Sequence, residues 1–193
     1  MKRIAWLGAV LALVVTAGWL VQAQTATTPA PKSDEASYLG ALSCKACHNP
    51  AKGDQFKKWE ASPHAQALKV LASEAAKAVA AKKGLKEAPD ASPQCLKCHV
   101  TGYGVKAELL GPKYDKNEGI TCEACHGPGS KYKTEHMKGK EAGLKAGMLE
   151  AGEKTCLRCH NAESPTAKPF KYAEMFPKIA HPLVKKPAGA TTP

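Results

Sequence analysis

The pattern C-x-x-C-H occurs four times in this 193-residue chain and uses all eight cysteines of the sequence. Its copies are CKACH (Cys44, Cys47, His48), CLKCH (Cys95, Cys98, His99), CEACH (Cys122, Cys125, His126) and CLRCH (Cys156, Cys159, His160). Any fold of this chain must therefore accommodate whatever the thiol pairs and their adjacent imidazoles bind together.

Three chemistries use paired cysteines, and the adjacent histidine distinguishes them. A disulfide framework suits an even number of cysteines in an exported protein, but it leaves the histidine unexplained. A tetrahedral zinc site takes four Cys or His ligands and does not require the histidine to follow the cysteine directly. Covalent haem attachment explains both features, because two thiols bond to the porphyrin vinyl groups and the next histidine ligates the iron. The repeat therefore predicts four covalently attached haem c groups.

Four haems also account for the composition of the chain. Only 6% of the residues are aromatic, and the 44% hydrophobic fraction includes many alanines, so a large apolar core of side chains is not expected. The macrocycles would supply most of the buried apolar surface. Glycine and proline interrupt the sequence every few residues, without an alternating strand pattern. We therefore expect a mainly α fold of short helices and loops wrapped around four haems, with little or no sheet.

One longer helix is predicted between Ser62 and Gly84. Ser62 suits the capping position, Pro63 suits the first helical position, and Gly84 suits the end of the helix. Its apolar face would consist of the residues at helical spacing, Leu68, Leu71, Ala75 and Val79.

The chain begins with the features of an export signal. Lys2 and Arg3 precede an almost unbroken apolar run from Ile4 to Val21, and the small residues up to Ala23 suit signal peptidase. The run is also long enough for an uncleaved membrane anchor. We expect a signal peptide or anchor at 1–23, a flexible linker at 24–37, a tetrahaem domain at 38–181 and a disordered tail at 182–193. The expected location is periplasmic, with a membrane-anchored or extracellular position as alternatives.

The net charge of the chain is +11, and it is +9 without the two positive charges of the N-terminal segment. Nucleic acid is not the expected partner, because the lysines are scattered and an exported chain meets little nucleic acid. Four haems would bring about eight propionate charges, which offset most of this excess. The lysines therefore compensate the cofactors in this interpretation, and a membrane is a partner only if the N-terminal segment stays uncleaved.

Three histidines remain outside the repeat, namely His64, His136 and His181. Bis-histidine ligation of three haems would use all of them. The fourth haem would then have an open axial position, or its sixth ligand would come from Met137, Met148, Met175 or a lysine.

The sequence resembles the tetrahaem cytochrome c554 family in stretches that cover most of the predicted folded part. These stretches are YLGALSCKACH with WEASPHA, CLKCHVTGYG, GITCEACHGPGS with EH shortly after, and CLRCHN. The resemblance implies three bis-histidine haems and one five-coordinate haem, which would be the haem of His99. The axial pairings that it implies are His136 with the haem of His48, His64 with the haem of His126, and His181 with the haem of His160.

The expected function is the transfer of single electrons between a redox protein donor and a redox protein acceptor, with no catalytic residues. One alternative is the reduction of a small N-oxide such as nitric oxide at the open haem. Another is a subunit of an extracellular cytochrome filament. Seven histidines cannot give two axial ligands to each of four haems, even when subunits exchange them, so a filament with bis-histidine ligation throughout is excluded.

Overall fold

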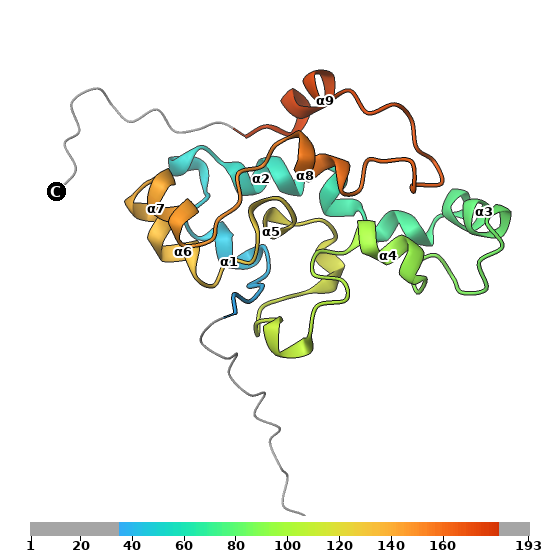
Figure 1. Cartoon of the computed structure of the whole chain (residues 1–193), viewed down its shortest axis with the longest axis horizontal. Coiled ribbons are helices and arrows are strands. Elements are labelled where there is room, and N and C mark those ends of the chain that lie inside the picture. Colours follow the sequence, from blue (N-terminus) through green and yellow to red (C-terminus); the bar gives the residue numbers. More distant parts are fainter. Residues whose placement is uncertain (1–34, 182–193) are drawn as a thin grey trace, which may run out of the picture.

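The computed structural model describes residues 35–181, which form short helices joined by long loops (Figure 1). The expected signal or anchor and the expected C-terminal tail lie outside the described residues. The α-helices are α1 (Leu42–Lys45), α2 (Gln55–Glu60), α3 (Glu74–Lys82), α4 (Pro93–His99), α5 (Cys122–His126), α6 (Tyr132–Glu135), α7 (Lys140–Lys145), α8 (Glu153–Leu157) and α9 (Tyr172–Ile179). Single turns of 3-10 helix are η1 (Pro50–Lys52), η2 (Pro63–Gln66), η3 (Lys69–Ala72), η4 (Ala107–Leu109), η5 (Lys116–Glu118) and η6 (His136–Lys138).

Sheet structure within residues 35–181 is limited to one isolated parallel bridge between Tyr38 and Leu110. The amide of Tyr38 donates to the carbonyl of Leu109 at 2.8 Å, and the amide of Gly111 donates to the carbonyl of Tyr38 at 2.7 Å. The predicted mainly α class with little or no sheet is confirmed.

The buried apolar side chains of the described part are few and mostly small. They are Ala41, Phe56, Ala65, Leu71, Ala80, Val100 and Tyr132. The longest helix, α3, has nine residues, and isolated helices shorter than about 12 residues are marginal in water. Neither helix propensity nor side-chain burial therefore explains why this chain folds.

The single helix predicted between Ser62 and Gly84 is wrong, because the segment is divided into η2, η3 and α3. Ser62 makes no capping bond, whereas the hydroxyl of Ser73 accepts from the amide of Ala76 at 3.2 Å and begins α3. The carbonyl of His64 accepts from the amide of Ala67 at 3.1 Å within η2 and also from the amide of Ile120 at 3.0 Å, so it is shared with a distant segment. A carbonyl that bonds to another segment is less available to a continuous helical ladder. The predicted end of the helix just before Gly84 is confirmed, since α3 ends at Lys82.

A buried carboxylate, that of Glu123, joins the start of the described chain to the third motif. Glu123 is 2% exposed and accepts from the amides of Leu39 at 2.8 Å, Gly40 at 2.9 Å and Gly129 at 2.7 Å. Just before this segment, the amide of Ser37 donates to the hydroxyl of Ser130 at 2.8 Å. The buried Ser37 therefore belongs to the fold, one residue before the boundary expected at residue 38.

Gly40 has a positive φ of 81°, which side-chain-bearing residues rarely adopt. A Cβ atom at this position would lie 2.2 Å from the carbonyl oxygen of Lys113. The close packing of two backbone segments therefore requires glycine here. Among the described residues, no helix is long and apolar enough to span a bilayer.

Candidate functional site

Each C-x-x-C-H motif forms one helical turn. The turns lie on α1, α4, α5 and α8, and the first and fourth are completed by amide bonds from His48 to the carbonyl of Cys44 at 3.0 Å and from His160 to the carbonyl of Cys156 at 2.9 Å. Residues three and four apart share one face of a helix. The local fold therefore presents both cysteines and the histidine of each motif to the same side.

Cysteines of different motifs lie near one another, so the four motifs are neighbours in the structure. The thiols of Cys44 and Cys122 lie close enough to shift each other's pKa, which makes the first and third motifs neighbours. Cys98 lies close enough to Cys159 to help raise the pKa of its thiol, after burial as the larger cause, which makes the second and fourth motifs neighbours. Cys156 lies close enough to Cys125 to help raise the pKa of its thiol, after burial as the larger cause. The spatial order of the motifs is therefore first, third, fourth and second.

The two alternative chemistries find no support in residues 35–181. All eight cysteines are free thiols in the structure. No group of three or more Cys, His, Asp or Glu side chains in this part of the chain converges on a metal site. The arrangement suits pairs of ligands on opposite sides of a metal rather than a tetrahedral site.

Six of the seven histidines form three pairs. The ring centroids of His48 and His136 are 5.8 Å apart with an interplanar angle of 12°. The corresponding values are 6.0 Å and 66° for His64 and His160, and 6.0 Å and 44° for His126 and His181. Metal–imidazole bonds of about 2.0 Å on each side, together with the radii of the two rings, separate axial imidazole centroids by about 6 Å. Each pair therefore leaves the space that one axially ligated metal ion occupies.

Two of the three expected pairings are wrong. His136 lies against His48 as the resemblance implied, but His64 lies against His160, and His181 lies against His126. The path of the chain explains the exchange. After the fourth motif the chain swings out toward α3 and returns over α8 to form α9, so His181 arrives away from the fourth motif (Figure 1).

Hydrogen bonds at Nδ1 orient four of the histidines. Nδ1 of His99 contacts the carbonyl of Ala67 at 2.5 Å, that of His126 the carbonyl of Leu149 at 3.3 Å, and that of His136 the carbonyl of Tyr132 at 2.9 Å. Nδ1 of His48 contacts the side-chain oxygen of Gln55 at 3.2 Å. A carbonyl accepts only when Nδ1 carries the proton, so Nε2 is left with its lone pair for a metal.

Burial lowers the pKa of three paired histidines. Burial is the largest cause for His64, His126 and His181, and a neighbouring histidine contributes in each case. A lower pKa favours the neutral imidazole, which is the form that ligates metals.

His99 has no histidine partner among the described residues. It lines a cavity of about 290 Å³ together with Cys95 and Cys98 of its own motif. The opposite wall consists of apolar side chains from η3 and α3, including Val70, Leu71, Ala75 and Val79. Leu71, Ala75 and Val79 belong to the apolar face predicted from the sequence, so this face covers the second motif. This mainly apolar cavity lies where the macrocycle of a haem attached to that motif would pack.

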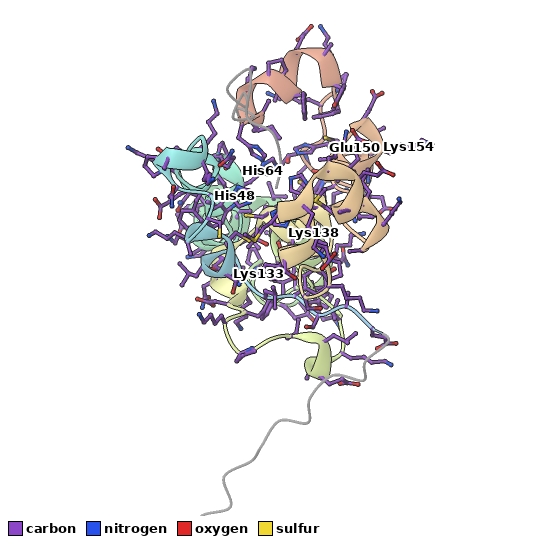
Figure 2. The ribbon with its side chains drawn as sticks, turned by 90° about the vertical axis from the view of Figure 1, so that its left-hand side faces the viewer. His48, His64, Lys133, Lys138, Glu150 and Lys154 are labelled. Atoms are coloured by element: carbon purple, nitrogen blue, oxygen red, sulfur yellow. The ribbon has the colours of Figure 1, made fainter. Side chains whose placement is uncertain are left out.

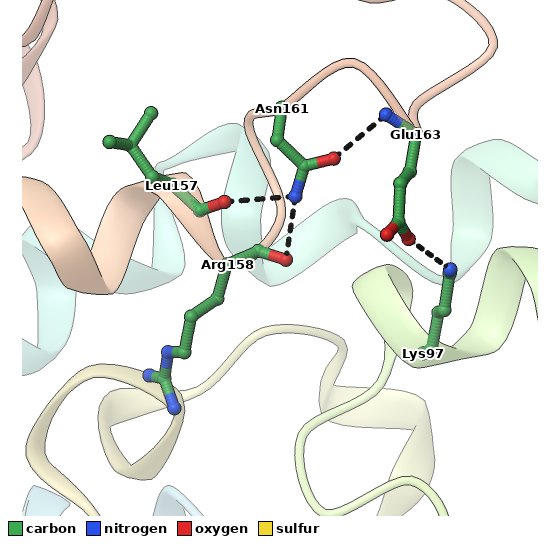
Figure 3. Close-up of polar contacts among 5 residues, drawn as sticks. All are labelled: Lys97, Leu157, Arg158, Asn161 and Glu163. Atoms are coloured by element: carbon green, nitrogen blue, oxygen red, sulfur yellow. Dashed lines mark hydrogen bonds and ion pairs between the residues drawn. The ribbon is translucent and has the colours of Figure 1, made fainter.

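The fourth motif is held in place from two sides. The ring of Phe170 stacks on His160 with centroids 4.8 Å apart and an interplanar angle of 21°. The side-chain amide of Asn161 donates to the carbonyl of Leu157 at 2.9 Å (Figure 3). The carboxylate of Glu163 binds the ammonium of Lys97 at 2.6 Å, which ties this loop to the second motif across the surface.

Figure 2 shows how the histidines sit relative to the charged side chains. His48 and His64 lie between the segment that carries them and the segment of α6 and α7. Lys154 lies at the rim of this view. Both of these histidines are half-buried, whereas His160 and His181 are exposed.

Sequence reasoning identified the motif residues and the three additional histidines, but it missed Gln55, Glu123 and Phe170. Glu123 occupies a variable position of its motif, and Gln55 and Phe170 lie outside any motif. The one signal for Glu123 was the presence of a carboxylate inside the short CEACH turn. No spacing rule predicts which side chain contacts a histidine, so Gln55 and Phe170 had no signal in the sequence.

A helical fold with little side-chain core, four C-x-x-C-H turns and imidazole pairs spaced for axial ligation defines a c-type cytochrome. The comparisons agree with this class. The family model described as "Cytochrome c554 and c-prime" matches residues 43–127. Cytochrome c-554 of Nitrosomonas europaea is 29% identical over 174 residues, which cover 80% of this chain and 72% of the relative. No solved structure matches the chain significantly.

The chain is similar to the cytochrome c554 family over a segment that includes its first three C-x-x-C-H motifs. This similarity and the four C-x-x-C-H turns indicate a c-type cytochrome, a class of proteins that bind haem c covalently and take part in electron transport.

Proposed function

We propose that the chain is an exported tetrahaem cytochrome that passes single electrons between a redox protein donor and a redox protein acceptor in the periplasm. Each C-x-x-C-H turn holds one haem through its two cysteines, and its histidine is the proximal ligand. The observation that carries this proposal is the set of three imidazole pairs at 5.8–6.0 Å. The axial pairs are His48 with His136, His126 with His181, and His160 with His64.

The protein sets position and environment in this proposal, and bound haem supplies the one-electron chemistry. The cysteines of successive motifs lie near one another, so the four sites are close together in the order first, third, fourth and second. The Nδ1 hydrogen bonds hold the imidazole planes. An electron therefore has a continuous route from the first motif to the second, with His99 at the end of the route.

The His99 site supports one further candidate function, the reduction of a small N-oxide such as nitric oxide. The described residues that line its cavity include no histidine or methionine besides His99 itself. Met137 and Met175 lie elsewhere, on η6 and α9, with exposed fractions of 72% and 41%. The cavity lining therefore favours an open axial position over ligation by either of these methionines.

Low-temperature electron paramagnetic resonance of the oxidised protein tests the ligand set. We expect three low-spin haems and one high-spin haem per chain, together with four haems by pyridine haemochrome assay. Nitric oxide should bind to the high-spin haem alone. Four low-spin haems would remove the open site and with it the second candidate function, and fewer than four haems would contradict the assignment of the motifs.

A further inference from the structure

Gln55 is placed against the first motif by the backbone around it. It is the first residue of α2, and its side-chain oxygen lies 3.2 Å from Nδ1 of His48. Its side-chain nitrogen donates to the carbonyl of Lys52 at 2.7 Å. Because the nitrogen is held by a carbonyl, the oxygen is the end of the amide that faces His48. The next residue is held as well, since the amide of Phe56 donates to the carbonyl of His48 at 3.1 Å.

This contact differs from the three other Nδ1 contacts. Those of His99, His126 and His136 end on backbone carbonyls, which a substitution does not change chemically. The contact of His48 ends on a side chain, so its chemistry depends on the identity of one residue. A stronger acceptor at Nδ1 makes the opposite nitrogen a better electron donor to a metal.

We propose that Gln55 is a positioning residue that sets the reduction potential of the haem held by His48 and His136. The inference rests on the ligand roles proposed above. The side-chain oxygen of Gln55 accepts a hydrogen bond from Nδ1–H of His48, which fixes the plane of the ring and increases electron donation from Nε2. Stronger donation favours oxidised over reduced iron, so the contact lowers the potential of this haem.

Two substitutions test the proposal in the haem-loaded protein. Gln55→Leu removes the acceptor and should shift one potential upward, and Gln55→Glu supplies a charged acceptor and should shift the same potential downward. The potentials are measured by redox titration followed by electron paramagnetic resonance, which separates the haems. The other three potentials should move much less than this one. Equal potentials in Gln55→Leu and the unsubstituted protein would overturn the proposal.

A matched control separates the hydrogen bond from a general effect of charge. Gln66 is exposed in η2, outside α2, so Gln66→Glu adds the same charge elsewhere on the surface. We expect a small, unselective shift in this variant. A shift in Gln66→Glu as large as that in Gln55→Glu, on the same haem, would show that charge alone is responsible and would overturn the proposal.

A second variant distinguishes this inference from the proposed function. His136→Ala should convert the low-spin haem of the first motif to high spin, which identifies its step in the titration. If His136→Ala changes no haem, the proposed ligand set is wrong. If His136→Ala identifies the step but neither Gln55 variant moves it, the ligand set stands and the role of Gln55 is wrong.

Discussion

Glu123 shows at the residue scale how a haem-binding motif is fastened to the rest of the chain. Its carboxylate is buried and is satisfied by three backbone amides, of Leu39, Gly40 and Gly129. A carboxylate can only accept hydrogen bonds, whereas an amide side chain also presents two donors. Glu123 therefore joins the segment before the first motif to the loop after the third. Glutamine, its closest isostere, cannot accept all three of these hydrogen bonds with both ends of its side chain.

We expect Glu123→Gln to lower the free energy of unfolding of the haem-loaded protein by about 2–4 kcal/mol, because buried amides lose a charged acceptor. Glu163→Gln is the matched control, since Glu163 is an exposed carboxylate that binds Lys97 at the surface. Its unfolding midpoint should stay unchanged, as surface ion pairs contribute little. Denaturant titration followed by circular dichroism measures both variants. Equal stability of Glu123→Gln and the unsubstituted protein would contradict the structural role of this carboxylate.

At the scale of elements, the sequence predicted what depends on local spacing. The apolar face predicted at Leu68, Leu71, Ala75 and Val79 follows from periods of three and four residues, and the last three of these residues line the cavity of the second motif. The continuous helix from Ser62 failed because distant segments compete for its backbone groups, as the bond from Ile120 to the carbonyl of His64 shows. Long-range pairing of this kind leaves no mark in a local pattern.

The pairing expected for His64 and His181 differs from the pairing in the structure for a related reason. The order of histidines along the chain says which are available, but the loop paths decide where each one arrives. The 21 residues from His160 to His181 include a wide excursion and all of α9 (Figure 1). They therefore deliver His181 to the third motif rather than to the fourth.

Removing one haem at a time tests the observed pairs. In Cys156→Ala/Cys159→Ala the fourth haem is absent, so His64 has no iron to ligate. Adding His64→Ala to this background should leave the number of low-spin haems unchanged, whereas adding His181→Ala should lower it by one. The reciprocal background, Cys122→Ala/Cys125→Ala, should reverse the two outcomes. Electron paramagnetic resonance counts the low-spin haems, and the opposite result in both backgrounds would restore the pairing implied by the family resemblance.

At the scale of the whole molecule, the side chains provide too little buried apolar surface to form a core by themselves. Within residues 35–181, seven apolar side chains are buried, and three of these belong to alanines. The excess of lysine over acidic residues is also unbalanced without the propionates that four haems would add. The small number of buried apolar side chains and the excess of positive charge therefore both indicate that the fold depends on the cofactors.

The haem-free chain is accordingly expected to be unfolded. Fixing a residue's backbone costs about 1–2 kcal/mol of conformational entropy, and a few small buried side chains cannot offset this cost over the described segment. A chain in which all eight cysteines are replaced by alanine should show the circular dichroism of a coil and no cooperative thermal transition. The haem-loaded protein should show helical dichroism and a cooperative transition under the same conditions. A cooperative transition in the haem-free chain would mean that the side chains alone specify the fold, and the short helices would then owe their stability to packing that does not involve the cofactors.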